Sequence, residues 1–308
     1  MRTAFIDSII EQARIHPEIF LMVGDLGFSV VEPFAKEFPD RFLNAGIAEQ
    51  NMTGMAAGLA SEGYHVFTYS IANFPTTRCL EQIRNDVCYH GLPVTVVAVG
   101  GGLAYGSLGY SHHAVQDYSM MRCLPEMVVL APGDPLETRA CVEWICNSPC
   151  ASYLRLGKAG ERICHKSPPH VDLGRIAFLS KENGSGLLLT TGATLHSAVM
   201  ASVSKELQER RILCDVGTIP IWSSATKPKI MDQISNYDWV ISIEDHLESG
   251  GFGSYLREAA GNNNILQSKI RTLALSDSIC GMVGSQSYLN KAGGISHEGI
   301  INFVLTHL

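Results

Sequence analysis

A glutamate at the head of a segment of small residues is the first place where this sequence could carry chemistry. Glu49 follows the polar stretch 44–48 and precedes the Gly- and Ala-rich stretch 54–60. Such a segment is typical of a helix that another backbone can approach closely. In the first turn of that helix, Glu49 is either a favourable partner of the helix dipole or, at an interface, a buried carboxylate suited to moving protons.

A glycine-rich loop with two adjacent histidines is the second candidate. It runs from Gly100 to His113 directly after the apolar run Val94–Val99, and loops at the carboxyl ends of parallel strands are where α/β proteins bind ligands. Its glycines match neither a Walker loop nor a dinucleotide-binding fingerprint. No Asp or Cys stands at metal spacing from His112 and His113, so we predict no metal site on this chain.

The third candidate is the acidic and glycine-rich stretch 244–254, where a predicted strand leads into a helix. Glycines here would suit an anion site at a helix N-terminus or simply a tight strand-to-helix turn. We favour the turn.

The elements that must position these residues alternate between two patterns. Apolar runs typical of buried strands alternate with longer segments of helical period, which predicts an α/β fold with a mainly parallel sheet and helices on both faces. In the first half we expect strands at Ile19–Val23, Tyr64–Tyr69, Val94–Val99, Met127–Leu130 and Ser152–Leu154, and helices at Ala4–Ile15, Ala48–Glu62, Arg78–Tyr89 and Pro135–Cys146.

A polar break at Gly157–Leu173, which contains Pro168-Pro169, predicts a linker between two domains, at residues 1–165 and 180–308. The second half repeats the α/β pattern, again with a mainly parallel sheet covered on both faces. We expect a strand at Gly186–Gly192, a helix at Leu195–Arg211, and strands at Ile212–Val216 and Trp239–Ile243.

Composition narrows the class of protein. The 308 residues are 46% hydrophobic, enough for two domains, and the net charge of -7 gives no basic field for nucleic acid. Charged residues within 1–7 argue against a signal peptide, and the uncharged segment 87–116 suits a strand and loop better than a membrane span. The nine cysteines form no CxxC pair. We therefore expect a soluble protein of the cytoplasm with buried thiols.

Taken in order, the motifs of this chain resemble the second half of transketolases, and also 1-deoxyxylulose-5-phosphate synthase and the β subunits of 2-oxoacid dehydrogenase E1 components. The resemblance implies a pyrimidine-binding domain for thiamine diphosphate followed by a transketolase C-terminal-like domain. The matching segments are Gly24-Asp25-Leu26, Gly46-Ile47-Ala48-Glu49-Gln50, Gln82-Ile83-Arg84-Asn85, Ser111-His112, Arg122-Cys123-Leu124-Pro125, Ala131-Pro132, Glu244-Asp245-His246 and Gly250-Gly251-Phe252-Gly253.

The resemblance implies roles around the cofactor. The glutamate that matches Glu49 hydrogen-bonds the aminopyrimidine ring of thiamine diphosphate and so lets the cofactor act as its own base. Phe74 matches an aromatic residue that stacks on the aminopyrimidine, although it could also be ordinary core. Asp25, with Leu26, would lie near the thiazolium, and Ile71 takes the place of a commonly aromatic member of the pyrimidine pocket.

The resemblance also implies a substrate site. Arg2, Ser29 and Arg155 fall where transketolases hold a sugar phosphate, which a guanidinium binds through charge-assisted hydrogen bonds. His112 matches a catalytic histidine that faces the reacting carbons of the donor. Gly100 and Leu108, however, replace a histidine and an aspartate that read the sugar.

These two replacements argue against the ordinary pentose-phosphate donors, because a site built to hydrogen-bond a hydroxyl discriminates strongly. The donor could be a deoxy or otherwise modified ketose, or a 2-oxoacid such as pyruvate.

Thiamine-diphosphate enzymes hold Mg²⁺ and the diphosphate with a Gly-Asp-Gly followed by a downstream Asn. This sequence has no Gly-Asp-Gly: Gly24-Asp25 continues with Leu26, and Gly133-Asp134 with Pro135. We therefore expect a partner subunit that carries this motif, with the active site at the junction of the two chains and an α2β2 assembly by analogy.

The leading hypothesis is the C-terminal (β) subunit of a split transketolase-like enzyme. It would transfer a two-carbon unit from a ketose or modified ketose to a sugar-phosphate or aldehyde acceptor. Two alternatives stay open. One is a 2-oxoacid-using relative, either synthase-like or an E1 β subunit, and the other is a non-catalytic homologue that keeps the fold.

Overall fold

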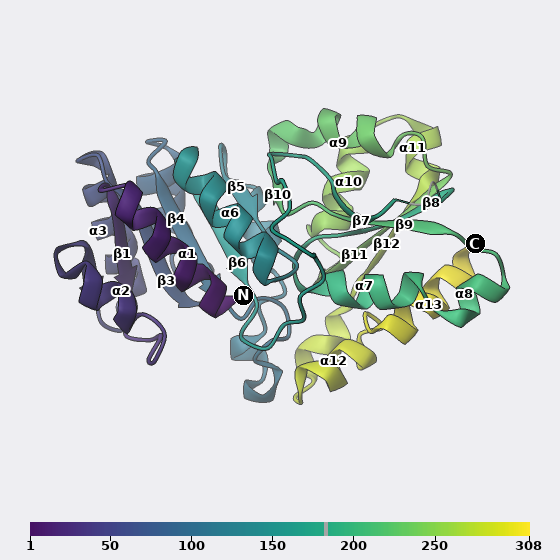
Figure 1. Cartoon of the computed structure of the whole chain (residues 1–308), viewed down its shortest axis with the longest axis horizontal. Helices are drawn as coiled ribbons and strands as arrows, with labels where there is room; N and C mark the ends of the chain where they lie inside the picture. The colour runs from purple at the N-terminus through teal and green to yellow at the C-terminus, as the bar shows by residue number, and fades with distance from the viewer. Residues whose placement is uncertain (182–183) are drawn as a thin grey trace.

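Two mainly parallel sheets, one for each half of the chain, form the framework of the computed structural model, which describes residues 1–181 and 184–308 (Figure 1). The first sheet has the strand order β10-β5-β6-β4-β3-β1-β2, and β10 alone runs antiparallel to its neighbour. Its strands are β1 (Ile19–Val23), β2 (Phe42–Asn44), β3 (His65–Ile71), β4 (Val94–Val99), β5 (Val128–Leu130), β6 (Ser152–Leu156) and β10 (Ile221–Trp222).

Both faces of the first sheet are buried, which explains why its strands read as continuous apolar runs. In β1, Leu21 and Val23 pack into the core that contains α1 and α6, whereas Met22 packs into the core that contains α3. The helices of this half are α1 (Arg2–Ile15), α2 (Glu32–Glu37), α3 (Glu49–Ser61), α4 (Leu80–Gln82), α5 (Asp117–Arg122) and α6 (Pro135–Asn147).

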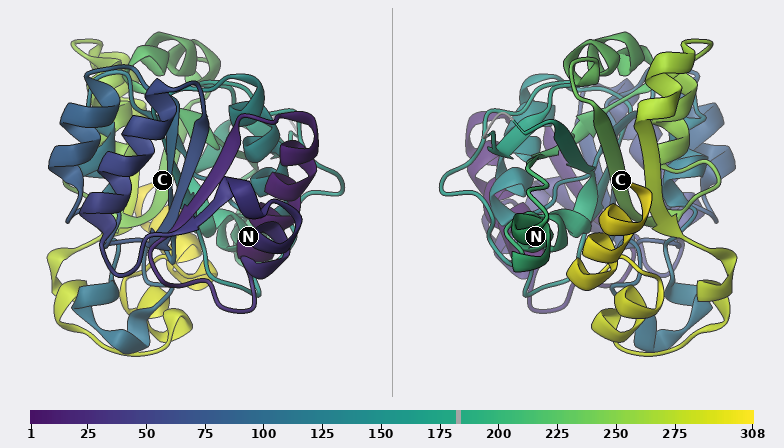
Figure 2. Two further views of the ribbon diagram at one scale, coloured as in Figure 1. Left: turned by 90° about the vertical axis from the view of Figure 1, so that its left-hand side faces the viewer. Right: turned by 90° about the vertical axis from the view of Figure 1, so that its right-hand side faces the viewer.

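The second sheet has the order β12-β11-β8-β9-β7, with β7 antiparallel at one edge. Helices α7, α8, α12 and α13 lie on one side of it, and α9, α10 and α11 lie on the other. The elements are β7 (Ala177–Ser180), β8 (Gly186–Thr190), α7 (Leu195–Ser202), α8 (Lys205–Glu209), β9 (Cys214–Thr218), α9 (Lys227–Ile234), β11 (Trp239–Leu247), α10 (Phe252–Ala260), α11 (Asn264–Lys269), β12 (Ile270–Leu275), α12 (Gln286–Ala292) and α13 (His297–His307). Figure 2 views the molecule from its two ends, with the first half facing the reader on the left and α13 on the right.

The predicted α/β class with two mainly parallel sheets is confirmed. Three element limits were wrong. The helix expected at Leu195–Arg211 is two helices, because Ser204 caps α8 by accepting a hydrogen bond from Leu207 N and so ends α7. The next strand therefore starts at Cys214. The helix expected from Arg78 begins only at Leu80 and continues as a π-helix at Ile83–Cys88.

The polar stretch Gly157–Leu173 contains no helix or strand. It is nonetheless held to the first half, since Asp134 Oδ2 accepts hydrogen bonds from the backbone of Cys164 at 2.8 Å and of His165 at 2.9 Å. The proposed domain limits at 165 and 180 remain a prediction.

One strand ties the halves together across this linker. β10 lies beyond the linker in the sequence, yet it pairs with β5 of the first sheet. Its Trp222 is fully buried, and its ring lies 5.6 Å from that of Tyr118 in the first half and 4.9 Å from that of Tyr255 in the second. The two halves therefore share one aromatic core.

All nine cysteines are free thiols. Within the described part of the chain, no helix combines the length and apolar character that crossing a membrane requires.

Candidate functional site

The predicted site residues lie on loops at one edge of the first sheet. Strands β1, β2, β3, β4 and β6 are parallel, so their carboxyl ends point the same way. The loops that leave them carry Asp25, Glu49, Phe74 and His112. This is the edge at which α/β proteins commonly bind ligands.

Glu49 is the first residue of α3, and its side chain is buried, with only 2% of its surface exposed. Its Oε2 accepts a hydrogen bond from Arg78 Nη1 at 2.8 Å, and the Arg78 side chain is itself half-exposed. The interface expected for this helix is therefore not needed to bury Glu49, because the chain buries it unaided. The result is a carboxylate shielded from water with a cation at its outer side.

The space beside Glu49 is narrow and contains an unpartnered polar atom. A Cβ atom added at Gly24 would lie 3.4 Å from Glu49 Cγ and 3.4 Å from Ser70 Oγ. Ser70 Oγ is buried and has no hydrogen-bond partner. The ends of β1 and β3 therefore meet the start of α3 around a small pocket that a polar ligand could complete.

Phe74 and His112 lie against the other side of Arg78. The Arg78 guanidinium stands 4.9 Å above the Phe74 ring, and the Phe74 and His112 rings meet edge to face at 5.5 Å. Asn73 fixes this contact, because its Nδ2 donates to the carbonyl groups of Ser111 at 3.1 Å and His113 at 2.9 Å. The structure thus brings Glu49, Phe74 and His112 together, as the sequence predicted, and adds Arg78.

Asp25, Leu26 and Ser29 occupy the loop after β1. Asp25 pairs with Asn44, whose Oδ1 accepts from Asp25 N at 3.1 Å and whose Nδ2 donates to Asp25 Oδ1 at 3.0 Å. Ser29 is exposed, and both Asp25 and Ser29 have a positive φ, so this loop is tightly folded. Ile71 ends β3 and is half-buried.

Arg2 opens α1, and its backbone N–H donates to Lys158 O at 3.3 Å, which brings Arg2 to the carboxyl end of β6. Its Nε is buried and has no hydrogen-bond partner. Tyr105 lies beside it: burial raises the pKa of Tyr105, and the charge of Arg2 acts in the opposite direction. Arg2 and Tyr105 thus share one corner of the site.

Tyr105 also explains the glycine at position 100. A Cβ atom at Gly100 would come within 2.1 Å of Tyr105 Cε2, and the backbone there has a φ of +90°. The Tyr105 ring therefore occupies the space that a side chain at position 100 would need. Sequence comparison by position could show the missing histidine but not the tyrosine that replaces it.

Arg155 does not fit the predicted role in binding a substrate phosphate. It is buried, and each of its N–H groups is engaged within the chain: Nε donates to Asp117, Nη1 to Tyr118 and Asp245, and Nη2 to Ala114 O and Asp245 O. No donor remains for a phosphate. The signal that misled was its type and position at the end of a strand, since its carboxylate partners are distant in sequence.

The turn reading of the stretch 244–254 fits the structure. Glu244 Oε2 accepts from Phe252 N at 2.6 Å and Oε1 from Gly253 N at 2.8 Å, so an internal carboxylate fills the N-terminus of α10. Gly251 has no room for a Cβ, which would lie 2.3 Å from Glu244 Oε2. Burial raises the pKa of Glu244 to about 8, although the two backbone N–H groups oppose that shift.

This raised pKa predicts a pH-dependent stability. Folded Glu244 keeps its proton up to about pH 8, whereas its ordinary value is 4.5, so its contribution to stability is present below pH 4.5 and is lost as the pH rises through 8. We expect Glu244→Gln to reduce the fall in Tm between pH 6 and pH 9, measured by thermal unfolding. A residual fall should remain, because burial also raises the pKa of Glu137 to about 7. The exposed Glu248→Gln is the control, and an unchanged fall in the Glu244 variant would refute the assignment.

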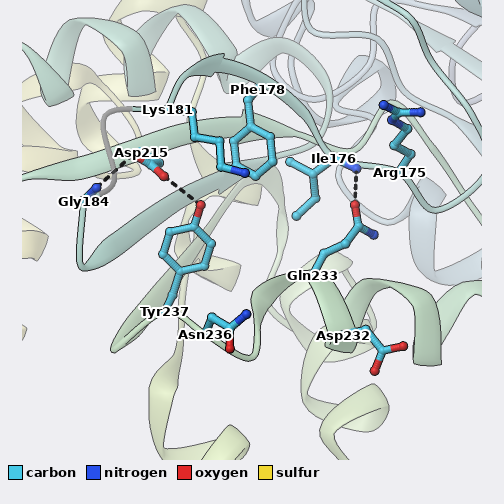
Figure 3. Close-up of a pocket in the computed structure, with 10 residues that line it drawn as sticks. All are labelled: Arg175, Ile176, Phe178, Lys181, Gly184, Asp215, Asp232, Gln233, Asn236 and Tyr237. Atoms are coloured by element: carbon cyan, nitrogen blue, oxygen red, sulfur yellow. Dashed lines mark hydrogen bonds between the residues drawn. The ribbon is translucent and has the colours of Figure 1, made fainter.

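A further polar pocket lies in the second half, between β7, β9 and α9 (Figure 3). Its polar groups largely satisfy one another: Asp215 accepts from Tyr237 Oη at 2.8 Å and from Gly184 N at 3.1 Å, and Gln233 accepts from Ile176 N at 3.0 Å. None of the predicted site residues lines it.

Comparison with known proteins agrees with this geometry. Residues 1–160 match the family model described as "Transketolase, pyrimidine binding domain". One of the two subunits of an apulose-4-phosphate transketolase, from Actinobacillus succinogenes, is 32% identical over 277 residues, which cover 90% of this chain and 88% of that protein. The 1-deoxy-D-xylulose-5-phosphate synthase of Syntrophus aciditrophicus is 29% identical over 96% of this chain but only 45% of its own length.

A solved structure is similar over nearly the whole length of both chains. It is described as a split gene transketolase in an inactive beta4 tetramer, and it has a TM-score of 0.85 at 28% identity, covering 100% of this chain and 97% of that one.

Proposed function

The chain belongs to the transketolase family, and we propose that it is the C-terminal subunit of a split, thiamine-diphosphate-dependent transketolase-type enzyme. It would transfer a two-carbon ketol unit from a ketose or modified ketose to a sugar-phosphate or aldehyde acceptor, together with a partner subunit. Relatives named as a transketolase subunit and as a split gene transketolase support this assignment.

The observation that carries this proposal is the buried Glu49 beside Phe74 and His112. The pocket fits the polar heterocycle of the cofactor on two counts. The carboxylate of Glu49 is held away from water at its edge, and the buried Ser70 Oγ next to it lacks a partner. Thiamine diphosphate, when bound, supplies the carbon nucleophile for ketol transfer. Glu49 would hold the aminopyrimidine, with Leu26 and Ile71 beside it and Asp25 toward the thiazolium.

The side chains of this chain would do three things in the reaction. Glu49 holds a proton in a site with little water, where a carboxyl group is an effective proton donor and acceptor. Phe74 offers a flat apolar surface against which a heterocycle can pack. His112, with its Nδ1 3.0 Å from Ser111 Oγ, is placed to hold or move a proton at a substrate hydroxyl.

The substrate phosphate would bind at the corner formed by Arg2, with Ser29 on the neighbouring loop. The unpartnered Nε of Arg2 supports this, because a buried guanidinium N–H without an acceptor is costly. Arg155 is left out, because its donors are all engaged within the chain. The side chain of Lys158, next to the backbone contact with Arg2, is a further cation that the sequence reading missed.

We further propose that the partner subunit supplies the Gly-Asp-Gly and downstream Asn for Mg²⁺ and the diphosphate, in an α2β2 assembly. The absence of Gly-Asp-Gly from this sequence supports it. Nine free thiols favour the reducing cytoplasm as the location.

The test is a donor assay on the chain mixed with its partner, thiamine diphosphate and Mg²⁺. We expect transfer of a two-carbon unit from a ketose to an aldehyde without release of CO₂. Release of CO₂ from pyruvate in the absence of ketol transfer would replace the proposal by the 2-oxoacid alternative.

Arg78 is the one observation in favour of that alternative. Its guanidinium lies between Glu49 and Phe74 and is half-exposed, so it could meet a substrate carboxylate.

Arg78→Met separates the two readings. A ketose has no carboxylate, so we expect kcat/KM for a ketose donor to fall by less than about tenfold. The exposed Arg84→Met, six residues along, serves as the control. A loss of about 100-fold or more that is confined to a 2-oxoacid substrate would contradict the ketose reading.

A further inference from the structure

The loop that carries Tyr105 and His112 is closed at its base by the backbone. Gly102 and Ala114 exchange two hydrogen bonds of 2.8 and 2.9 Å, and Gly101 N donates to Leu156 O at 2.9 Å. Residues 103–113, which we call the His112 loop, lie between these two ends. Its start and its end therefore converge on the carboxyl end of β6.

Arg155 fills the centre of this base. Its side chain is only 2% exposed, and it touches both ends of the loop: Nη2 donates to Ala114 O at 2.9 Å, and a Cβ at Gly101 would lie 2.5 Å from Arg155 Nε. Its Nε donates to Asp117 Oδ2 at 2.6 Å, just beyond the loop. Asp117 is held in turn by Tyr153 Oη at 2.6 Å.

The third side of the network comes from the second half of the chain. Arg155 Nη1 donates to Asp245 Oδ1 and Nη2 to Asp245 O, from a residue of β11. A Cβ at Gly102 would lie 1.9 Å from Asp245 Oδ2, so the loop backbone rests directly on this carboxylate. The second half also reaches the loop at Gly106, whose carbonyl accepts from Gly284 N at 3.2 Å.

Resting on the proposed function, we propose that Arg155 is a positioning residue that fixes the His112 loop against the C-terminal half. A guanidinium has five donors in a fixed plane, so one side chain can hold both ends of the loop, Asp117 and Asp245 at once. A lysine keeps the charge but cannot span these partners. The C-terminal half thereby acquires a task in the active site to which it contributes no substrate contact.

The first test measures hydrogen exchange on the full chain in Arg155→Lys. We expect exchange of residues 103–113 to rise by about tenfold or more, as befits lost hydrogen bonds to charged groups. Exchange of β1 and β8 should stay within about twofold, since these strands do not touch the network. Arg139→Lys, which alters the exposed pair with Glu11 on α6, is the matched control. No change in the loop, or an equal rise in all strands, overturns the proposal.

Gly102→Ala tests the same contact without altering any charge. The added methyl group must displace the loop from Asp245, and the φ of +63° makes it harder still to accommodate. It should reproduce the selective rise in exchange if Arg155→Lys proves too unstable to measure. Protection equal to that of the unaltered chain in this variant overturns the proposal as well.

Activity of the assembled enzyme gives the second readout. Misplacing His112 by about 1 Å predicts a fall of about 100-fold in kcat for Arg155→Lys, with the KM for the donor changed by less than about threefold. A phosphate ligand would instead raise KM, and that result overturns the positioning role. If the unaltered complex shows no ketol transfer, the proposed function fails, while the exchange experiment still decides the role of Arg155.

Discussion

Replacing Glu49 by glutamine is expected to lower kcat for ketol transfer by about 10³-fold, the size of effect that a well-placed proton-handling group supplies. Glutamine keeps the shape of the side chain and can still hydrogen-bond a heterocycle, but it cannot hold or release a proton. The fold should survive, because the ion pair that is lost has the half-exposed Arg78 as its other member. Steady-state kinetics of the assembled enzyme, with thermal unfolding in parallel, measure both quantities.

Glu62→Gln is the matched control, since Glu62 is an exposed residue at the end of the same helix. It should leave kcat within about twofold, as surface substitutions away from a site generally do. A Glu49→Gln enzyme with normal turnover would remove Glu49 from the mechanism. A variant that has lost cofactor binding altogether would instead give Glu49 a role in affinity, and titration with thiamine diphosphate distinguishes the two.

The second large effect is the dependence on a partner subunit. We expect the isolated chain to show no ketol transfer above background, and addition of a subunit with Gly-Asp-Gly and a downstream Asn to raise the rate by at least about 10³-fold, because only the complex positions the cofactor. Size measurement in solution should show both chains in one assembly. Chelation of Mg²⁺ should abolish the activity of the complex.

The control for this experiment is the same partner with the Asp of its Gly-Asp-Gly changed to Ala. It should still bind the chain but should not restore activity. Full turnover by the isolated chain with thiamine diphosphate and Mg²⁺ would show that no second polypeptide is needed.

The sequence predicted the parts of this structure that depend on local pattern. Strands β1 and β4 were placed to the residue, because burial of both sheet faces makes each an unbroken apolar run with clear limits. Glu49 was selected for its place at the start of a helix of small residues, and the structure buries it there. Local pattern sufficed in these cases because the cause was itself local.

The sequence could not predict relations between distant residues. Arg155 lies 38 residues from Asp117 and 90 from Asp245, and only the packing of the two halves brings three charges into one buried network. Arg78 was passed over because it precedes its helix, and nothing nearby in the sequence marks its contact with Glu49, 29 residues away. The π-helix at Ile83–Cys88 has no sequence signature of its own.

The pairing of β10 with β5 bears on how such chains can be recombined. Exchanging C-terminal segments between relatives at the linker would carry β10 away with the incoming piece, and the new Trp222 equivalent would have to fit a foreign Tyr118. Cutting there without replacement would leave β5 as a bare, apolar edge prone to pair with other molecules. A crossover placed after Trp222 keeps the seven-stranded sheet whole and the aromatic core half-native. The polar linker is thus the visible seam of the chain, whereas the mechanical seam lies some fifty residues further on, by the count from Leu173 to Trp222.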